Sequence, residues 1–172
     1  MKRVIMNTSI WRIILAIVRL YLGWCWLHAG FEKLMGSHFS AAGFIKGALT
    51  KTSGPHPAVQ FWWADFLQHV AIPNITVFND VIPWGEFLVG LSLILGVFTK
   101  FGVLMGIVMN FSYMFSGSVS VNPQMLLLEI IVFIHSAKAA YIGLDYWVMP
   151  KFRQLVSSWK AADFFSRESE SA

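Results

Sequence analysis

Residues 10–35 read IWRIILAIVRLYLGWCWLHAGFEKLM, an apolar run that few charged residues interrupt. A helix of about 20 apolar residues spans the hydrocarbon core of a bilayer, so this run is long enough to cross it. The run follows a basic N-terminus and imitates a signal peptide, but it contains Arg12 and Arg19 and lacks a convincing small-residue cleavage site. We therefore expect a retained membrane-spanning helix.

The composition of the whole chain agrees with a bilayer as its main solvent. Of the 172 residues, 56% are hydrophobic and 13% are charged, whereas about 25% are charged in soluble domains. This balance excludes a soluble enzyme, a disordered chain and a collagen-like fibre. The single cysteine, Cys25, excludes an internal disulfide and a dithiol redox pair. The basic residues are scattered rather than clustered, so the net charge of +4 does not indicate nucleic-acid binding.

Three further apolar runs predict three more spans, over residues 83–98, 101–116 and 124–143. Pro83 and Pro123 fit the first turn of a helix, Asn122 fits an N-cap, and Gly117 ends the third span. The Thr99-Lys100 junction is so short that the second and third spans must form a tight antiparallel hairpin. The expected fold is an all-α membrane protein, a four-transmembrane-helix bundle.

Basic residues orient this bundle, because cytoplasmic segments hold an excess of Lys and Arg. With both termini cytoplasmic, most basic residues lie at the inner ends of the spans: Lys2, Arg3, Arg12, Lys100, Lys138, Lys151, Arg153, Lys160 and Arg167. Residues 150–172 predict a basic amphipathic tail on the inner leaflet. We expect one domain, residues 1–172, in the plasma membrane of a bacterium or archaeon.

The segment between the first two spans, residues 36–82, is too long and too aromatic to be a simple linker. Residues 57–70 predict a helix, and residues 37–49 predict a second one. The apolar positions of the helix over residues 57–70 are Val59, Trp62, Trp63, Phe66 and Val70. Tryptophan pairs favour the headgroup region of a membrane. We expect an outer aromatic helical cap that lies on the membrane surface.

Polar side chains inside the spans are costly, so each is a candidate functional residue. In the assigned topology, five of them gather in the outer half of the bundle, from four different spans: Glu32, Lys33, Glu86, Asn110 and Glu129. Arg19 and Lys33 share one face of the first span with Gly23, Trp26 and Gly30. The structural alternative is a packing seam in which Lys33 pairs with Glu86 or Glu129 and no ligand binds.

The histidines are weaker candidates. His28 and Glu32 are four residues apart, so they form either a proton-relay pair near the outer surface or a hydrogen-bonded pair under the cap. A bis-histidine haem is disfavoured, because His28 and His135 differ in depth by roughly 9 Å at about 1.5 Å per residue. Asp65 and His69 lack a third metal ligand in register, which favours a local ion pair.

The polar positions occur in an order that resembles a known family. The run RLYLGWCWLHAGFEKL, residues 19–34, looks like the opening signature of the DoxX/DoxD family, with an arginine, glycines, an aromatic residue and a lysine on one face. PWGEFLVGLSLILGVFTK, residues 83–100, resembles the second-helix motif of that family. Asn110, Asn122-Pro123, Glu129 and Gly143-Leu144-Asp145 follow in order, so the resemblance covers most of the chain. By this pattern the motif positions are Arg19, Lys33, Glu86, Asn110 and Glu129.

The resemblance implies a four-helix membrane bundle. The long outer segment is similar to the DoxD-like branch, the membrane subunit of thiosulfate:quinone oxidoreductase. We therefore expect a subunit that passes electrons from an outer-side donor such as thiosulfate to a quinone. Glu86 and Glu129 would exchange the protons of the quinone, and Lys33 and Asn110 would bind its carbonyls; Arg19, His28 and Glu32 complete the predicted cofactor-binding set. The sequence shows no electron carrier, so a second redox subunit supplies one or the donor and the quinone react directly.

Two other function classes stay open. In the first, the chain is a non-enzymatic membrane anchor or assembly partner, whose polar cluster only orders the helices and whose aromatic cap docks another protein. In the second, it is a small transporter, which the lack of an obvious inverted repeat or broken helix disfavours. A homo-oligomer is compatible with all of these functions.

Overall fold

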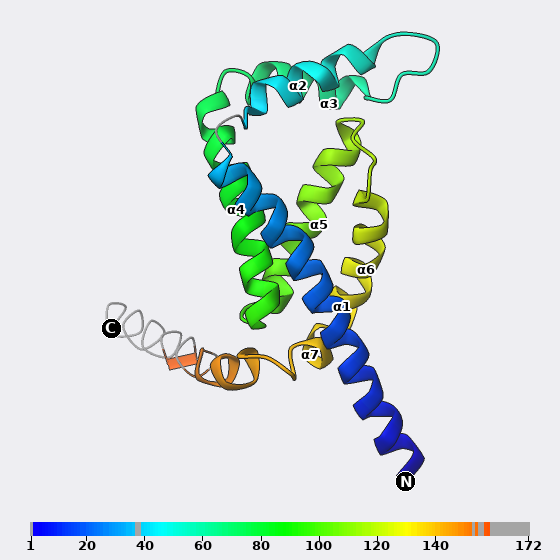
Figure 1. Ribbon diagram of the computed structural model, residues 1–172, viewed down its shortest axis with the longest axis vertical. Helices are drawn as coiled ribbons and strands as arrows, with labels where there is room; N and C mark the ends of the chain where they lie inside the picture. The colour runs from blue at the N-terminus through cyan, green and yellow to red at the C-terminus, as the bar shows by residue number, and fades with distance from the viewer. Residues whose placement is uncertain (1, 37–38, 153, 155–156, 159–172) are drawn as a thin grey trace, which may run out of the picture.

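The computed structural model describes residues 2–36, 39–152, 154, 157 and 158. These residues form helices and connecting turns and contain no β-strand, so the all-α prediction is confirmed (Figure 1). The bundle comprises α1 (Lys2–Met35), α4 (Ile75–Leu95), α5 (Thr99–Phe115), α6 (Asn122–Ile134) and the short α7 (Ser136–Ala139). The cap comprises α2 (Ala41–Leu49), η1 (Thr50–Thr52), α3 (Phe61–Phe66) and the π-helix η2 (Leu67–Ala71).

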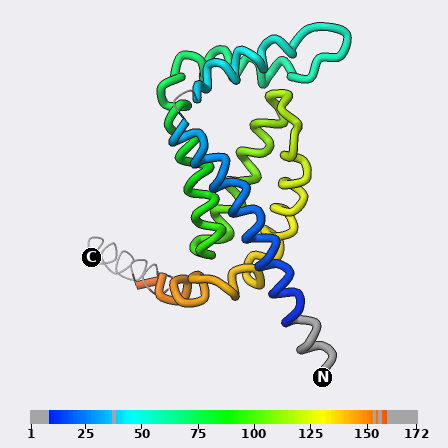
Figure 2. Tube along the Cα trace, in the orientation of Figure 1, coloured from blue at the N-terminus to red at the C-terminus, as the bar shows by residue number. Residues whose placement is uncertain are grey.

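The cap lies across one end of the bundle, and the start of α1 lies at the other end (Figure 1). Helices α1 and α4 run side by side, and α5 and α6 form the second pair, as the Cα trace also shows (Figure 2). Residues 145–152 are helical and lie at the end opposite the cap. The described part of the molecule is therefore an elongated bundle with a helical cover on one end.

Two helical segments of the described chain are long and apolar enough to cross a membrane, Ser9–Met35 and Ile75–Leu95. Helix α6 is apolar but shorter. Large apolar side chains on these helices are exposed, for example Ile17 and Leu127, as expected of surfaces that face lipid rather than water. The 13 residues of α6 extend roughly 20 Å at about 1.5 Å per residue, less than the hydrocarbon core. Four spans and cytoplasmic termini therefore stay predictions.

Glycines bring α1 and α4 into close contact. A Cβ atom at Gly90 of α4 would overlap the backbone of Leu27 in α1, and one at Gly23 of α1 would lie 2.9 Å from the backbone nitrogen of Ile94. Small residues of this kind allow the backbones of membrane helices to approach one another. The predicted glycine seam on the first helix is therefore its contact with α4.

Two apolar clusters stabilise this arrangement. The first lies inside the bundle and includes Leu22, Leu93, Val103 and Val132, which are completely buried. The second lies under the cap and consists of Ala41, Ile45, Ala48, Val59, Leu67 and Ala71. The start of α4 packs against the second cluster through Ile75, Phe78 and Ile82, so α4 connects the cap to the bundle.

The second helix begins earlier than the sequence predicts. Helix α4 starts at Ile75, and Pro83 lies inside it rather than in its first turn. The absence of a proline N–H leaves the carbonyl of Asn79 without its helical donor, a loss that membrane helices tolerate when neighbouring groups compensate. The predicted boundary at residue 83 was therefore wrong, and residues 75–82 belong to α4 rather than to the cap alone.

The fourth apolar run does not form one continuous helix. Helix α6 ends at Ile134, and α7 and a turn follow where the sequence predicts helix to residue 143. The Arg19 guanidinium donates hydrogen bonds to the carbonyl of Ala139, the last residue of α7, and to that of Ile142 in the turn that follows. The start of α6 also differs, because Val121 is the N-cap residue and the Asn122 side chain donates to the carbonyl of Ser118 at 2.8 Å.

Other local predictions agree with the structure. Gly117 adopts a positive φ of 69° directly after α5, and Pro123 lies in the first turn of α6. Helices α4 and α5 form the expected hairpin, although its turn is residues 96–98 and Thr99 already belongs to α5. In the cap, the predicted helices 37–49 and 57–70 are present but begin later, at Ala41 and Phe61. Most of the predicted tail, residues 150–172, lies outside the described residues.

Candidate functional site

Glu86 is the centre of a polar cluster contributed by three helices. Its side chain is buried in α4. The Lys33 ammonium of α1 lies 2.6 Å from Oε2, and the Tyr113 hydroxyl of α5 donates to Oε1 at 2.5 Å. Both carboxylate oxygens therefore have a strong partner, and the ion pair that the sequence analysis gave as its structural alternative is present.

Close packing of α1 against α4 positions this ion pair. A Cβ atom at Gly30 would lie 2.9 Å from the carbonyl oxygen of Pro83 and would overlap the backbone of Phe87. Lys33 follows Gly30 by almost one helical turn, and Glu86 follows Pro83 by the same interval. The two side chains consequently meet almost one helical turn beyond this close contact of the two backbones.

Glu129 of α6 is the centre of a second cluster, which is completely buried. Trp26 Nε1 donates to Oε1 at 2.7 Å, and Asn110 Nδ2 donates to Oε2 at 2.8 Å. A Cβ atom at Gly106 would lie 2.5 Å from Oε1, so a glycine is needed there to leave room for the carboxylate. Glu129 makes no salt bridge within the described part of the chain.

An aromatic contact joins the two clusters. The ring centroids of Trp26 and Tyr113 are 6.4 Å apart, with an interplanar angle of 30°. Phe44 of the cap packs edge-on against Tyr113 at 5.7 Å. Tyr113 therefore contacts the first carboxylate through its hydroxyl, the donor of the second carboxylate through its ring, and the cap through Phe44.

Tyr113 also lines an apolar groove between α4 and α5. The groove has a volume of about 750 Å³ and extends from the cap to the turn between the two helices. Apolar side chains form most of its wall, among them Phe78, Leu88, Met105 and Met109. This volume is within the range of small-molecule sites, roughly 300–1,000 Å³. The groove can therefore hold an extended apolar molecule, with Tyr113 as one of its few polar contacts.

Arg19 lies apart from both clusters. Its guanidinium is at the other end of the bundle, where Nη1 donates to Ala139 and Nη2 to Ile142, at 3.2 and 2.7 Å. The 14 positions from Arg19 to Lys33 on α1 correspond to roughly 21 Å along the helix. In this structure Arg19 fixes the chain after α7 and does not join the predicted cofactor-binding residues in the outer half.

His28 and Glu32 also lie outside the clusters. Nδ1 of His28 is 3.5 Å from Oε2 of Glu32, and the two side chains are 55% and 67% exposed. They contact each other, as their spacing predicts, but on an outer face of α1. Asp65 and His69 form a similar exposed pair at 2.9 Å. Among the described residues, no group of three or more acidic, histidine or cysteine side chains could hold a metal ion.

The predicted site residues did not include Trp26 and Tyr113, which connect the two carboxylates. Trp26 shares the helical face of Arg19 and Lys33, and Tyr113 follows Asn110 by almost one turn of α5. Their positions on polar faces are the signal that could have identified them. The sequence places these residues in one group and leaves Glu86 and Glu129 open as partners of Lys33; the structure pairs Lys33 with Glu86, and Asn110 with Glu129.

Comparison with known proteins identifies the family. The model of the DoxX family matches residues 14–119, more than half of the chain. The chain therefore belongs to the DoxX family and is a membrane protein, and the resemblance that the sequence suggests is confirmed at this level. The match contains Lys33, Glu86 and Asn110 and ends before Glu129. No curated protein and no solved structure matches the chain significantly.

Proposed function

We propose that this DoxX-family membrane protein is a subunit of a quinone-linked redox system, with the quinone ring beside Tyr113. One observation carries the proposal: Tyr113 lines the apolar α4–α5 groove, and its hydroxyl is bonded to the buried Glu86. A polar hydrogen-bonding group at the wall of a long apolar groove suits a molecule with a small polar ring and a hydrocarbon tail. Isoprenoid quinones have this form.

The groove residues fit such a molecule. Phe78, Leu88 and Met105 offer apolar contacts along the groove for the tail. The Tyr113 hydroxyl can turn its hydrogen from Glu86 towards a carbonyl oxygen of the ring. Lys33 is bonded to Glu86 and does not line the groove, so we now assign carbonyl binding to Tyr113 rather than to Lys33.

The same contacts provide a path for protons. A quinone accepts two electrons and two protons on reduction. Tyr113 can release its proton to the ring oxygen and recover one from the Lys33 ammonium through Glu86, along bonds of 2.5 and 2.6 Å. The Lys33 side chain is 28% exposed, so water can return a proton to it. Glu86 is then the relay between a solvent-accessible amine and the groove.

The second carboxylate has a different role in this proposal. Glu129 and Asn110 do not line the groove. Glu129 accepts a hydrogen bond from the indole of Trp26, against which the Tyr113 ring packs, and Asn110 donates to the other oxygen of Glu129. Glu129 and Asn110 are therefore positioning residues for the aromatic pair.

The electron donor is assigned through the resemblance alone. We propose an outer-side donor, with thiosulfate as the first to test, and a second redox subunit that binds the cap in the plasma membrane. The cap presents large aromatic side chains for such a contact, since Phe61 is 83% and Trp62 54% exposed. Aromatic residues are enriched in protein interfaces.

Quinone binding can be tested with Tyr113→Phe, which removes one hydroxyl and keeps the ring contacts with Trp26 and Phe44. The full chain in mild detergent is titrated with decylubiquinone, and tryptophan fluorescence reports binding because Trp63 lines the groove. We expect roughly tenfold weaker binding in Tyr113→Phe. Tyr141→Phe is the matched control, because Tyr141 lies at the opposite end of the bundle. Equal affinity in all three proteins would refute a ring position beside Tyr113.

A second function is favoured by a specific observation. Both buried carboxylates already have protein partners for each of their oxygens, so no ligand is needed to satisfy them. A membrane anchor or assembly partner would use the clusters only to order the helices. That function predicts co-purification with another protein and no quinone in an organic extract analysed by mass spectrometry. Near-stoichiometric quinone that is lost in Glu86→Gln contradicts it.

A further inference from the structure

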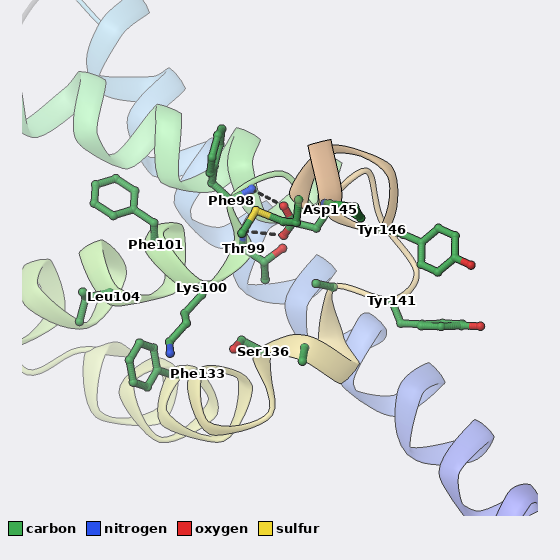
Figure 3. Close-up of a pocket in the computed structure, with 14 residues that line it drawn as sticks. Phe98, Thr99, Lys100, Phe101, Leu104, Phe133, Ser136, Tyr141, Asp145 and Tyr146 are labelled. Carbon is green, nitrogen blue, oxygen red and sulfur yellow. Dashed lines mark hydrogen bonds between the residues drawn. The ribbon is translucent and has the colours of Figure 1, made fainter. Parts of the chain in front are cut away.

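A second cavity lies at the end of the bundle opposite the cap. The first turn of α5, the end of α6, α7 and residues 141–150 surround a volume of about 620 Å³ (Figure 3). Phe98 and Phe101 separate it from the groove between α4 and α5. None of the residues assigned to quinone binding lines this cavity, so a molecule bound here would not occupy the proposed quinone site.

The wall of this cavity has polar groups that lack partners. Thr99 is completely buried, and its Oγ1 has no hydrogen-bond partner in the described part of the chain. Lys100 is exposed and forms no salt bridge with a described carboxylate; its ammonium lies 5.3 Å from the ring centroid of Phe133. Figure 3 shows Thr99, Lys100 and Ser136 around the same hollow. A cation without a carboxylate partner, on a wall that also contains an unsatisfied hydroxyl, is suited to an anionic group.

The acidic residue of the wall, Asp145, already has hydrogen-bond partners within the protein. Asp145 accepts the backbone N–H groups of Phe98 and Thr99 at 2.7 and 2.8 Å, one on each carboxylate oxygen. It also interacts electrostatically with Arg19. The negative charge of Asp145 is therefore balanced by the start of α5 and by Arg19, and it does not neutralise Lys100.

Apolar side chains continue from the cavity along α5. Phe101 and Leu104 belong to its wall and are 63% and 39% exposed, and Val108 follows one turn later at 51%. Spacings of three and four residues place them on one stripe of the helix. The polar end of the cavity thus opens onto an exposed hydrocarbon-like surface that runs towards the middle of the bundle.

We propose that this cavity binds an anionic phospholipid, with its phosphate at Lys100 and an acyl chain along Phe101 and Leu104. A free anion would not use the apolar stripe, and a zwitterionic lipid would leave its cationic group without a free carboxylate. A second basic group lies at the same end of the bundle, since the Arg12 guanidinium is 3.9 Å from the centroid of the Tyr141 ring, which points away from the hollow in Figure 3. Basic groups at a membrane surface favour anionic lipids.

The test uses native mass spectrometry of the full chain released from micelles that contain equal amounts of phosphatidylglycerol and phosphatidylcholine. We expect phosphatidylglycerol adducts on the unaltered protein and roughly tenfold fewer on Lys100→Gln. Lys100→Arg should retain them. Lys138→Gln is the matched control, because Lys138 is an exposed lysine at the same end that does not line the cavity.

Three results would overturn the proposal. The first is an equal number of phosphatidylglycerol adducts on Lys100→Gln and on the unaltered protein, with unchanged helicity in both. The second is equal binding of phosphatidylcholine. The third is displacement of the lipid by millimolar inorganic phosphate, which would assign the cavity to a free anion. None of these results depends on whether decylubiquinone binds beside Tyr113.

Discussion

Loss of Lys33 should destabilise the protein more than loss of the Glu86 charge, although both changes break the same ion pair. The exposed fraction of the Glu86 side chain is 2%, and that of Lys33 is 28%. Lys33→Met keeps the apolar stem and leaves a buried carboxylate whose remaining partner is the Tyr113 hydroxyl. Glu86→Gln instead leaves an ammonium that water can reach and an amide oxygen that can still accept a hydrogen bond. The two variants therefore differ in which charge stays buried.

The expected sizes follow from this difference in burial. Removal of one partner from a buried ion pair costs about 3–5 kcal/mol, because the other charge is left uncompensated. Tyr113 still donates to Glu86, so we expect the lower limit, about 3 kcal/mol, for Lys33→Met. For Glu86→Gln we expect about 1–2 kcal/mol, since neither remaining group is a buried unpaired charge. The double variant should cost at least about 1 kcal/mol less than the sum of the two.

The free energy of unfolding can be measured by titrating dodecylmaltoside micelles with sodium dodecyl sulfate and following helicity by circular dichroism. Lys46→Met is the control, because Lys46 is exposed on α2 and forms no salt bridge among the described residues. We expect a change of less than about 0.5 kcal/mol for it. If Glu86→Gln is the more costly variant, or if the double variant equals the sum, the pair does not have the burial that the structure gives it.

Two further predictions use the same titration. Gly90→Ala should lower the free energy of unfolding by about 2 kcal/mol, because its Cβ would overlap the Leu27 backbone and force α1 away from α4. Gly47→Ala is the control and should not destabilise the protein, because the space around its Cβ is open. Equal effects of the two variants would contradict the close contact of α1 and α4. Trp26→Phe should lower the free energy of unfolding by about 1–3 kcal/mol, because it leaves Oε1 of the buried Glu129 without a hydrogen-bond donor. An unchanged free energy of unfolding would mean that another group replaces the indole as donor.

The existence of the main helices could be predicted from the sequence, but their ends could not. An apolar run of about 20 residues indicates a helix surrounded by lipid, and α1 and α4 both contain such a run. The ends of these helices depend on contacts with residues far away in the sequence, which the local pattern of apolar residues does not show. The local sequence predicts a helix start at Pro83, but α4 begins upstream at Ile75, where Ile75 and Phe78 pack against the apolar cluster under the cap. Beyond the end of α6, the chain is held by Arg19, more than 100 residues away in sequence, which donates to the carbonyls of Ala139, the last residue of α7, and Ile142.

The candidate site was predictable for its charged members and not for its aromatic ones. A lysine or glutamate is rare in an apolar chain, so its position alone marks it, and the sequence places Lys33 in one group with its two possible partners, Glu86 and Glu129. The chain has 15 Phe, 8 Trp and 4 Tyr, so one more ring at helical spacing is not distinctive. Their positions on polar faces are a weak signal among so many rings, and the hydrogen bonds from Trp26 to Glu129 and from Tyr113 to Glu86 distinguish these two rings.

The two buried carboxylates, which the family pattern places in the same class, differ in their surroundings. Glu86 is bonded to a partly exposed cation on one side and to a hydroxyl at the groove on the other. Glu129 is bonded to an indole and an amide, neither of which exchanges protons readily, and does not line the groove. A change in protonation at Glu86 can therefore reach a molecule in the groove through Tyr113, whereas one at Glu129 acts on the aromatic pair. If the protein reduces a quinone, substitutions at Glu86 should alter the pH dependence of the reaction, and conservative substitutions at Glu129 should alter mainly the affinity.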